Sequence, residues 1–252
     1  MKRTVTVIAE LGSNPSAYAV AGRATVGNWD FESFCRAASE AGATHVKIQL
    51  WKTESFPPSE QTAKLPLEFP RALLPEFVAQ AHRRGLKAGA SVFDVEAVNM
   101  AAAQCDFLKL AAREQNNVEL TVAVMQATKR HNKQPFYRSI STRRIVNNAG
   151  FHIGQWEPLY AIQEYPTPIA VALIKLIFAH RMFMREGFPD NWGWSSHTKS
   201  GYDCVLAARL GASVIEKHMS LSKSDSEGAH SLLPDEFGRM VSQIRRISNA
   251  TR

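Results

Sequence analysis

The sequence predicts an α/β fold, a closed (β/α)8 TIM barrel in which each of eight parallel strands is followed by a covering helix. Strand-like and helix-like segments alternate strictly, the strand-like runs number eight, and one type of helix-to-strand turn recurs along the chain. The 252 residues, 45% of them hydrophobic, can bury the core of one large domain. We therefore expect residues 1–252 to form a single barrel domain.

The strand-like runs are short and rich in β-branched and aromatic residues. They are Val5–Glu10, His45–Leu50, Leu86–Ser91, Phe107–Leu110, Pro135–Ser139, Leu159–Ile162, Trp192–Ser195 and Val214–His218. Between them lie amphipathic stretches with apolar residues at helical spacing, namely Phe31–Ala41, Arg71–Arg84, Val95–Ala103, Val118–Lys129, Ala170–Arg185, Tyr202–Leu210 and Glu236–Ile247.

Three of the predicted helices end in a glycine that leads directly into the next strand. The segments are EAGATHVKI, RRGLKAGAS and RLGASVIEKH. Glycine adopts the left-handed conformation after a helix at little cost, so the same turn is reused around one architecture. An open doubly wound sheet is the alternative, but no GxGxxG motif follows the first strand to favour it.

Two kinds of interruption break this alternation. Leu11–Asp30 and Trp51–Phe69 are rich in Gly, Pro, Ser and Asn, which predicts long loops after the first and second strands. In a barrel, such loops carry substrate contacts. Between Ser139 and Leu159 the run Asn147–Gly150 interrupts the one helical candidate, so we expect the helix after the fifth strand to be rudimentary.

The formal charge of +7 bears on the class of partner. Small basic groups such as His82–Arg84 and Lys129–His131 carry much of it, and they are typical of solvated helix ends. The surplus could attract nucleic acid, but no recognition motif accompanies it, and an anionic small substrate explains it equally well.

The cysteines and the apolar runs bear on the compartment. Cys35, Cys105 and Cys204 are odd in number, lie far apart and form no CxxC pair, which favours a reducing cytoplasm. No run of about 18 apolar residues occurs, and the short apolar run at the start soon reaches Glu10. We expect a cytoplasmic protein that neither spans nor is anchored to a membrane.

The active site of a barrel lies at the carboxyl ends of its strands, so the polar residues at the strand exits are candidates for chemistry. Lys47 and Lys109 lie within hydrophobic strands, where an unmatched charge is costly. They indicate an anion in the barrel mouth, the alternative being lysines that end a strand in solvent. His197 and His218 end consecutive strands and can converge on a divalent metal, although hydrogen-bonded structural histidines are also common.

Seven segments at predicted strand ends and loops carry a family resemblance. IAELGSN, THVKIQLWKTESF, SVFD, EYPTP, SSHT, LGASVIEKHMSL and SLLPDEF occur in this order along nearly the whole chain. The sequence thereby resembles the N-acetylneuraminate (sialic acid) synthases, the NeuB family, with their legionaminic and pseudaminic relatives. The resemblance implies a transferase of carbohydrate biosynthesis that joins phosphoenolpyruvate to an aldose or N-acyl amino sugar, giving a 2-keto-3-deoxy sugar acid and phosphate.

The resemblance also implies roles for individual residues. Phosphoenolpyruvate would contact Lys47 and Ser91 through its carboxylate, and Lys109, Ser139, Gln163 and Ser195 through its phosphate. The metal, Mn²⁺ by expectation, would be held by His197 and His218. Glu114 and Glu10 would be catalytic, and Tyr165 and Glu227 would contact the acceptor sugar.

The sequence departs from the family pattern at several of these positions. Asn14-Pro15 replaces Asn-His, Ala111-Ala112-Arg113 replaces Gly-Ser-Gly, Gln163 replaces Asn or Ser, and Ser196 replaces the Asp before the metal histidine. We expect Arg113 to point inward and replace the lost hydroxyl as a phosphate contact.

The chain ends at Arg252, and the small antifreeze-like domain common in the family is not expected within it. In the family that domain lends an arginine to the acceptor site of a neighbouring subunit, so the acceptor and a homodimeric state both stay open. Two alternatives to the synthase reaction also stay open. One is a catalytically altered barrel with a binding role, and the other is a relative that acts on a nucleotide or nucleic acid.

Overall fold

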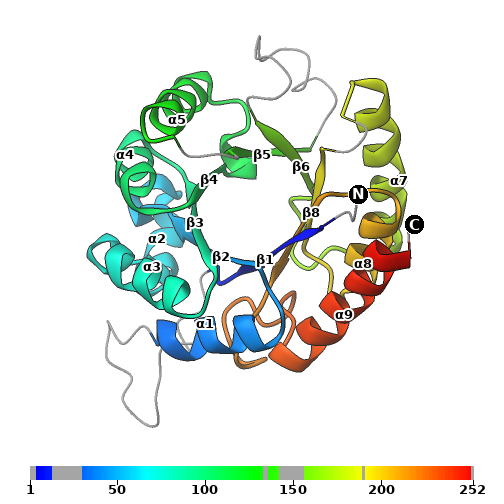
Figure 1. Cartoon of the computed structure of the whole chain (residues 1–252). Coiled ribbons are helices and arrows are strands. Elements are labelled where there is room, and N and C mark those ends of the chain that lie inside the picture. Colours follow the sequence, from blue (N-terminus) through cyan, green and yellow to red (C-terminus); the bar gives the residue numbers. More distant parts are fainter. Residues whose placement is uncertain (1–3, 13–29, 133–135, 142–155, 189–190, 251–252) are drawn as a thin grey trace.

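The computed structural model describes residues 4–12, 30–132, 136–141, 156–188 and 191–250. Within them, eight parallel strands pair in sequence order, and the last strand pairs with the first to close a barrel. Figure 1 looks along this ring, with the strands inside and the helices around them. The predicted TIM barrel is confirmed.

The strands are β1 (Thr6–Glu10), β2 (His45–Leu50), β3 (Lys87–Val92), β4 (Phe107–Leu110), β5 (Phe136–Ile140), β6 (Glu157–Ala161), β7 (Gly193–Ser196) and β8 (Val214–His218). The helices are α1 (Phe31–Glu40), α2 (Pro58–Lys64), α3 (Leu74–Arg83), α4 (Val95–Gln104), α5 (Val118–Arg130), α7 (Ile169–Arg185), α8 (Tyr202–Arg209) and α9 (Pro234–Ala250). Short 3-10 turns include η2 (Thr53–Ser55), η3 (Leu65–Leu67), η4 (Arg71–Leu73) and η5 (Ala112–Glu114).

The element limits differ from the predicted ones mostly by one to three residues, with one larger difference. The segment Trp51–Phe69 was predicted to be a loop, but it contains α2, which begins at Pro58 and buries none of its residues. Proline at the first helical position is favourable, and a helix without a buried face gives no periodic signal. The rudimentary helix predicted after the fifth strand falls within residues 142–155, outside the described residues.

The predicted glycine turns are present at three helix ends. Gly42, Gly85 and Gly211 follow α1, α3 and α8 with φ of 83°, 71° and 105°. A side chain in this region is strained, which explains why the sequence repeats glycine before a strand. The described helices include none long and apolar enough to cross a membrane.

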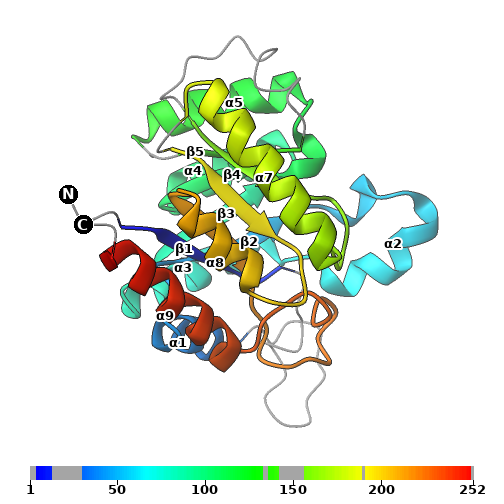
Figure 2. The ribbon, with the colours of Figure 1, turned by 90° about the vertical axis from the view of Figure 1, so that its right-hand side faces the viewer.

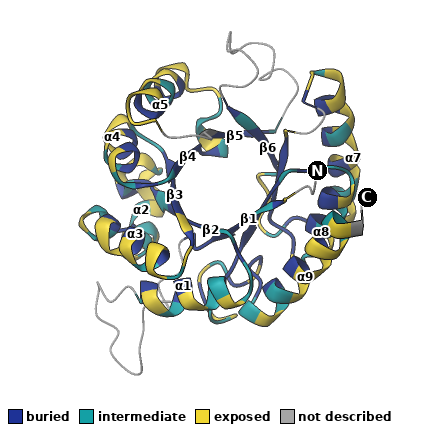
Figure 3. Cartoon of the chain, viewed as in Figure 1, coloured by how far each residue is buried: buried dark blue, intermediate teal, exposed yellow. Residues whose placement is uncertain are grey.

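Apolar side chains fill two layers, one between the helices and the strands and one inside the barrel. Figure 3 shows buried residues on the strands and on the barrel-facing sides of the helices, with exposed residues outside. Inside the ring, one cluster joins inward-facing residues of five strands: Ile8, Phe107, Tyr137, Leu159 and Val214. Phe107 fills the space beside Gly89, where an added Cβ would lie 2.2 Å from its ring.

The alternation of side chains along each strand sets a polar layer above this apolar plug. Residues two positions further along point to the same side of the sheet, so Ile8 is followed by Glu10, Phe107 by Lys109 and Val214 by Glu216. Figure 2 shows α2 and the connection between β8 and α9 beyond the end of the barrel at which the strand arrows finish. The polar layer therefore faces the loops.

Candidate active site

A cavity of about 510 Å³ opens at the carboxyl ends of the strands. Every strand contributes to its lining, directly or through the residues that follow it. Of the residues that the sequence predicts as functional, those that line the cavity are Glu10, Lys47, Ser91, Lys109, Arg113, Ser139, Gln163, Tyr165, Ser195, His197, His218 and Glu227. The barrel thus brings together residues that are far apart in the sequence.

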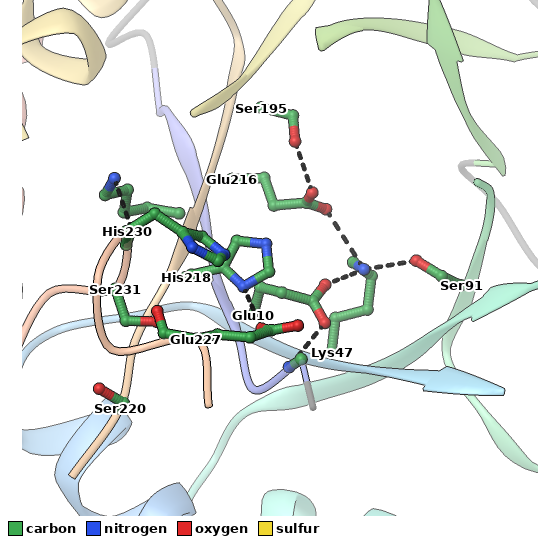
Figure 4. Close-up of polar contacts among 12 residues, drawn as sticks. Glu10, Lys47, Ser91, Ser195, Glu216, His218, Ser220, Glu227, His230 and Ser231 are labelled. Atoms are coloured by element: carbon green, nitrogen blue, oxygen red, sulfur yellow. Dashed lines mark hydrogen bonds and ion pairs between the residues drawn. The ribbon is translucent and has the colours of Figure 1, made fainter. Parts of the chain in front are cut away.

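The floor of the cavity is a buried network of two lysines and two carboxylates. Lys47 forms an ion pair with Glu10, and its Nζ donates to Ser91 Oγ at 2.5 Å. Lys109 forms an ion pair with Glu216, whose second carboxylate oxygen lies 3.7 Å from Lys47 Nζ. Figure 4 shows Lys47 between Glu10 and Ser91. The positive charges of Lys47 and Lys109, for which the sequence showed no partner, are therefore balanced by carboxylates of the protein itself.

Burial and charge pull the pKa values of this network in opposite directions. Burial lowers the pKa of Lys47 to about 7, although Glu216 acts to raise it. Burial alone would raise the pKa of Glu216, but the charges of Lys109 and Lys47 outweigh it and hold that pKa well below its ordinary value. Glu216 is therefore ionised between the two lysines, and Ser195 Oγ donates to it at 2.8 Å.

Glu216 is a floor residue at a predicted strand exit to which the sequence analysis gave no role. It stands two positions before His218 on β8 and is 2% exposed. The sequence did contain a signal for Glu216. Side chains two positions apart on a strand point to the same side, so Glu216 faces the barrel interior together with His218. Glu216 carries the negative charge that Lys47 and Lys109 need in order to be buried.

The other side of the cavity carries groups able to bind an anion. Ser139 is fully buried, and its hydroxyl has no hydrogen-bond partner among the described residues. Arg113 lines the cavity at the rim, where its guanidinium lies 4.5 Å from the ring centroid of Phe56 and 4.8 Å from that of Phe93. Its Nη2 donates to Ser55 Oγ at 3.0 Å.

Glu114, predicted to be catalytic, is the one predicted site residue that does not line the cavity. Its carboxylate accepts from Arg113 Nε at 3.3 Å and from Asn117 Nδ2 at 3.1 Å. Successive side chains of the 3-10 turn η5 point in different directions, so Arg113 takes the cavity side. Gln163 Nε2 donates to the Ala112 carbonyl at 3.1 Å and supports this turn.

His197 and His218 lie side by side with their ring centroids 5.4 Å apart. His197 Nδ1 donates to the Ile162 carbonyl at 2.6 Å, and His218 Nδ1 lies 2.8 Å from Glu227 Oε2. Each ring thereby keeps its Nε2 available. Burial lowers the pKa of His218 to about 3 and that of His197 well below its ordinary value, so both rings are neutral, as metal ligands must be.

The Ile162 carbonyl does for His197 what an acidic neighbour does in a metal site. A ligating histidine usually donates its second ring nitrogen to a carboxylate or carbonyl, which fixes its orientation. Ser196, which replaces the family's aspartate, instead accepts from Lys217 Nζ at 3.3 Å. The orientation of His197 therefore rests on the backbone that follows β6 rather than on its own neighbour.

A third histidine, which sequence reasoning missed, lies beside this pair. The ring centroid of His230 is 4.7 Å from that of His218 and 6.2 Å from that of His197. One ligand atom each of His218, Glu227 and His230 lie within 4.8 Å of one another, a grouping that could hold a metal ion. His230 belongs to the connection between β8 and α9, where no strand or helix period indicates its direction.

Comparisons with known proteins agree with the fold and with the resemblance seen in the sequence. The model of the NeuB family matches residues 155–252. The resemblance to the NeuB family is confirmed. The N,N'-diacetyllegionaminic acid synthase of Campylobacter jejuni is 35% identical over 94 residues, which are 36% of this chain and 27% of that protein. The pseudaminic acid synthase of Helicobacter pylori is 26% identical over 248 residues, covering 83% of this chain and 67% of that protein.

A solved structure supports the fold over nearly the full length. The N-acetylneuraminic acid synthetase of Leptospira borgpetersenii superimposes with a TM-score of 0.84 at 22% identity, covering 98% of this chain and 85% of that one. At this identity the likeness concerns the fold. The two relatives, of which this chain covers 27% and 67%, are synthases of sugar acids, and a sugar-acid synthase-like enzyme is the function class that they support.

Proposed function

We propose that this chain condenses phosphoenolpyruvate with an aldose or N-acyl amino sugar to give a 2-keto-3-deoxy sugar acid and phosphate. The observation that carries the proposal is the composition of the cavity. Cationic and hydroxyl groups from β2 to β5 face two neutral, buried imidazoles across one space of about 510 Å³. This arrangement suits an anionic substrate beside a carbonyl to be activated.

The anion would bind along the side of the cavity formed by β2 to β5. Lys47 and Ser91 would hold the carboxylate of phosphoenolpyruvate, and Lys109, Ser139 and Ser195 would surround the phosphate. Because the floor lysines are already paired with carboxylates, the three or so negative charges of the substrate call for additional positive charge. Arg113 at the rim supplies it through a planar fork of donors that fits a phosphate.

The histidines fit a divalent metal by the chemistry of their donors. His197 and His218 are 6% and 4% exposed, are neutral, and each has one nitrogen committed to an acceptor and one available. Imidazole suits Mn²⁺ and the later first-row ions. When bound, the ion supplies Lewis acidity to the aldehyde oxygen of the acceptor.

Of the two carboxylates predicted to be catalytic, Glu10 faces the cavity and Glu114 does not. We therefore assign proton transfer to Glu10. C3 of phosphoenolpyruvate forms a bond to the aldehyde carbon as the C2–C3 and aldehyde π bonds break, and water adds to C2 while one of its protons passes to the former aldehyde oxygen. The C2–O bond to phosphate then breaks, the C2 hydroxyl becomes the keto group, and its proton leaves with phosphate. Glu10 forms an ion pair with Lys47, whose pKa burial lowers to about 7, so Lys47 can also give up a proton near neutral pH.

The acceptor would lie on the opposite side, against Tyr165. The ring centroid of Tyr165 lies 4.2 Å from that of His197, and the side chain is 53% exposed at the cavity mouth. An exposed aromatic face beside a metal histidine is suited to pack on a sugar ring. Glu227 lines the same part of the cavity and can accept from sugar hydroxyls.

One observation favours a second candidate, a barrel that binds a ligand without turnover. The Arg113 guanidinium lies close to Phe56 and Phe93 and contacts Glu114, which leaves the predicted acid–base residue outside the cavity. A barrel in this state would bind phosphoenolpyruvate and release no phosphate.

The test measures phosphate release from phosphoenolpyruvate with Mn²⁺ across a panel of aldoses and N-acyl amino sugars. We expect acceptor-dependent release, and loss of release in Lys109→Met. Thermal shift in phosphoenolpyruvate plus Mn²⁺ separates the two candidates. Stabilisation without phosphate release from any acceptor would favour the binding barrel, and neither stabilisation nor release would refute both.

A further inference from the structure

His230 is the least explained side chain of the cavity. It is 7% exposed, and its Nε2 is buried without a hydrogen-bond partner within the described part of the chain. A buried polar atom left without a partner destabilises the fold, unless a ligand satisfies it. The buried Nε2 is therefore open to a ligand.

The surroundings of His230 point to a cation as that ligand. Imidazoles that share one metal ion at about 2.1 Å have ring centroids roughly 4.5 to 6.5 Å apart. The three centroid separations among His197, His218 and His230 are 5.4, 4.7 and 6.2 Å. Figure 4 shows the rings of His218 and His230 next to each other, with Glu227 alongside.

The backbone of His230 is held in place by a buried lysine that the proposed reaction does not use. Lys217 is fully buried, and its Nζ donates to the His230 carbonyl at 3.1 Å and to the Thr198 carbonyl at 2.5 Å. It therefore joins the residue after His197 to the loop that carries His230. Lys217 thereby fixes the position of the His230 loop relative to the segment that carries His197.

Glycine at position 12 makes room for the arrangement on the opposite side. A Cβ on Gly12 would lie 1.8 Å from Glu227 Oε2 and 3.0 Å from His218 Nδ1. The absent side chain allows Glu227 to reach His218, whose Nδ1 lies 2.8 Å from it. With His218 Nδ1 donating to this carboxylate, its Nε2 is left to bind the metal, a pairing common in metal sites.

We propose that His230 is a third imidazole ligand of the metal, completing a set with His197 and His218 in which Glu227 orients His218. Three imidazoles with a coordination position left open are typical of catalytic sites rather than structural ones. The inference deepens the proposed function, because it concerns the same site, but its test needs no substrate.

The test is a Co²⁺ titration of the metal-stripped full chain, followed by visible absorption and by calorimetry. Against the wild type, His230→Ala should bind Co²⁺ at least about 100-fold more weakly and with an altered spectrum. The matched control is His131→Ala, at the exposed C-terminal end of α5, which should titrate like the wild type. Added imidazole should occupy the space left in His230→Ala and restore the wild-type spectrum.

Each result has a defined reading. Wild-type affinity and spectrum in His230→Ala would overturn the proposal, as would a wild type that binds no Co²⁺. Circular dichroism of the metal-stripped variants shows whether His230→Ala folds, and rescue by imidazole would exclude misfolding as the cause of weak binding. If Co²⁺ binds through His230 but no acceptor releases phosphate from phosphoenolpyruvate, the ligand set stands and the proposed reaction fails.

Discussion

The floor and the rim of the cavity are built in different ways. The floor residues Glu10, Lys47, Lys109 and Glu216 come from strands, are at most 5% exposed and are paired with one another. Arg113 at the rim comes from a 3-10 turn and has a side chain 36% exposed. Strand residues cannot move without disturbing the barrel, whereas a turn can exchange one side chain for another. We infer that the floor is the fixed part of the proposed anion site and that the rim is its adjustable part.

The largest expected effect comes from breaking the floor. Glu216→Gln leaves Lys109 buried without its carboxylate, and removal of one partner of a buried ion pair costs about 3–5 kcal/mol. Urea unfolding should show a decrease of this size in the free energy of unfolding. The double variant Lys109→Met/Glu216→Gln removes both charges and should recover much of the loss. A decrease under about 1 kcal/mol in Glu216→Gln would mean that the floor charges are solvated rather than paired.

A smaller effect on stability, but a specific one on binding, is expected at the rim. Arg113→Ala should raise the Michaelis constant for phosphoenolpyruvate roughly tenfold, equivalent to about 1.4 kcal/mol, because a charged contact to phosphate is lost. Stability should change by no more than about 1 kcal/mol, since the side chain is partly exposed and contacts Phe56 and Phe93.

Arg113→Lys is the matched variant, because it keeps the charge and loses the planar fork. An intermediate Michaelis constant would assign part of the effect to bidentate geometry. Unchanged kinetics in Arg113→Ala would identify Arg113 as a bystander and improved kinetics would identify it as an obstruction; either result would contradict an inward-acting guanidinium.

The floor was more accessible to sequence reasoning than the rim, for a physical reason. Along a strand, side chains alternate between two faces, so a strand limit wrong by one residue still leaves Lys47 and Lys109 on the two strands that flank β3, both facing the barrel interior. Turns and loops have no such period. In η5, Arg113 faces the cavity and Glu114 does not, and His230 after β8 lies beside the two predicted metal histidines. Both placements depend on contacts that exist only once the barrel is closed.

The smallest loss of unfolding free energy is expected at the ion pair between Arg71 and Asp94, which lies outside the cavity. This pair tests whether burial explains the large loss expected from breaking an ion pair of the floor. Asp94 caps α4 by accepting from the Ala97 amide at 2.8 Å, and its side chain is 34% exposed.

Asp94→Asn keeps a good capping residue and removes the charge, so the expected loss at pH 7 is below about 1 kcal/mol, as for partly exposed pairs.

Burial acts to raise the pKa of Asp94, but hydrogen bonds from Arg71 and the Ala97 amide outweigh it and hold the pKa below its ordinary value of 3.8. A carboxylate with a lowered pKa stabilises the fold above its ordinary pKa, and this contribution disappears as the pH falls through the lowered value. The difference in unfolding free energy between wild type and Asp94→Asn should therefore be constant from pH 7 to about 5 and shrink towards pH 3. A difference that stays constant over the whole range would show that packing, and not charge, separates the two proteins. A loss as large as that of Glu216→Gln would break the comparison, because burial would then not explain the stability of the floor.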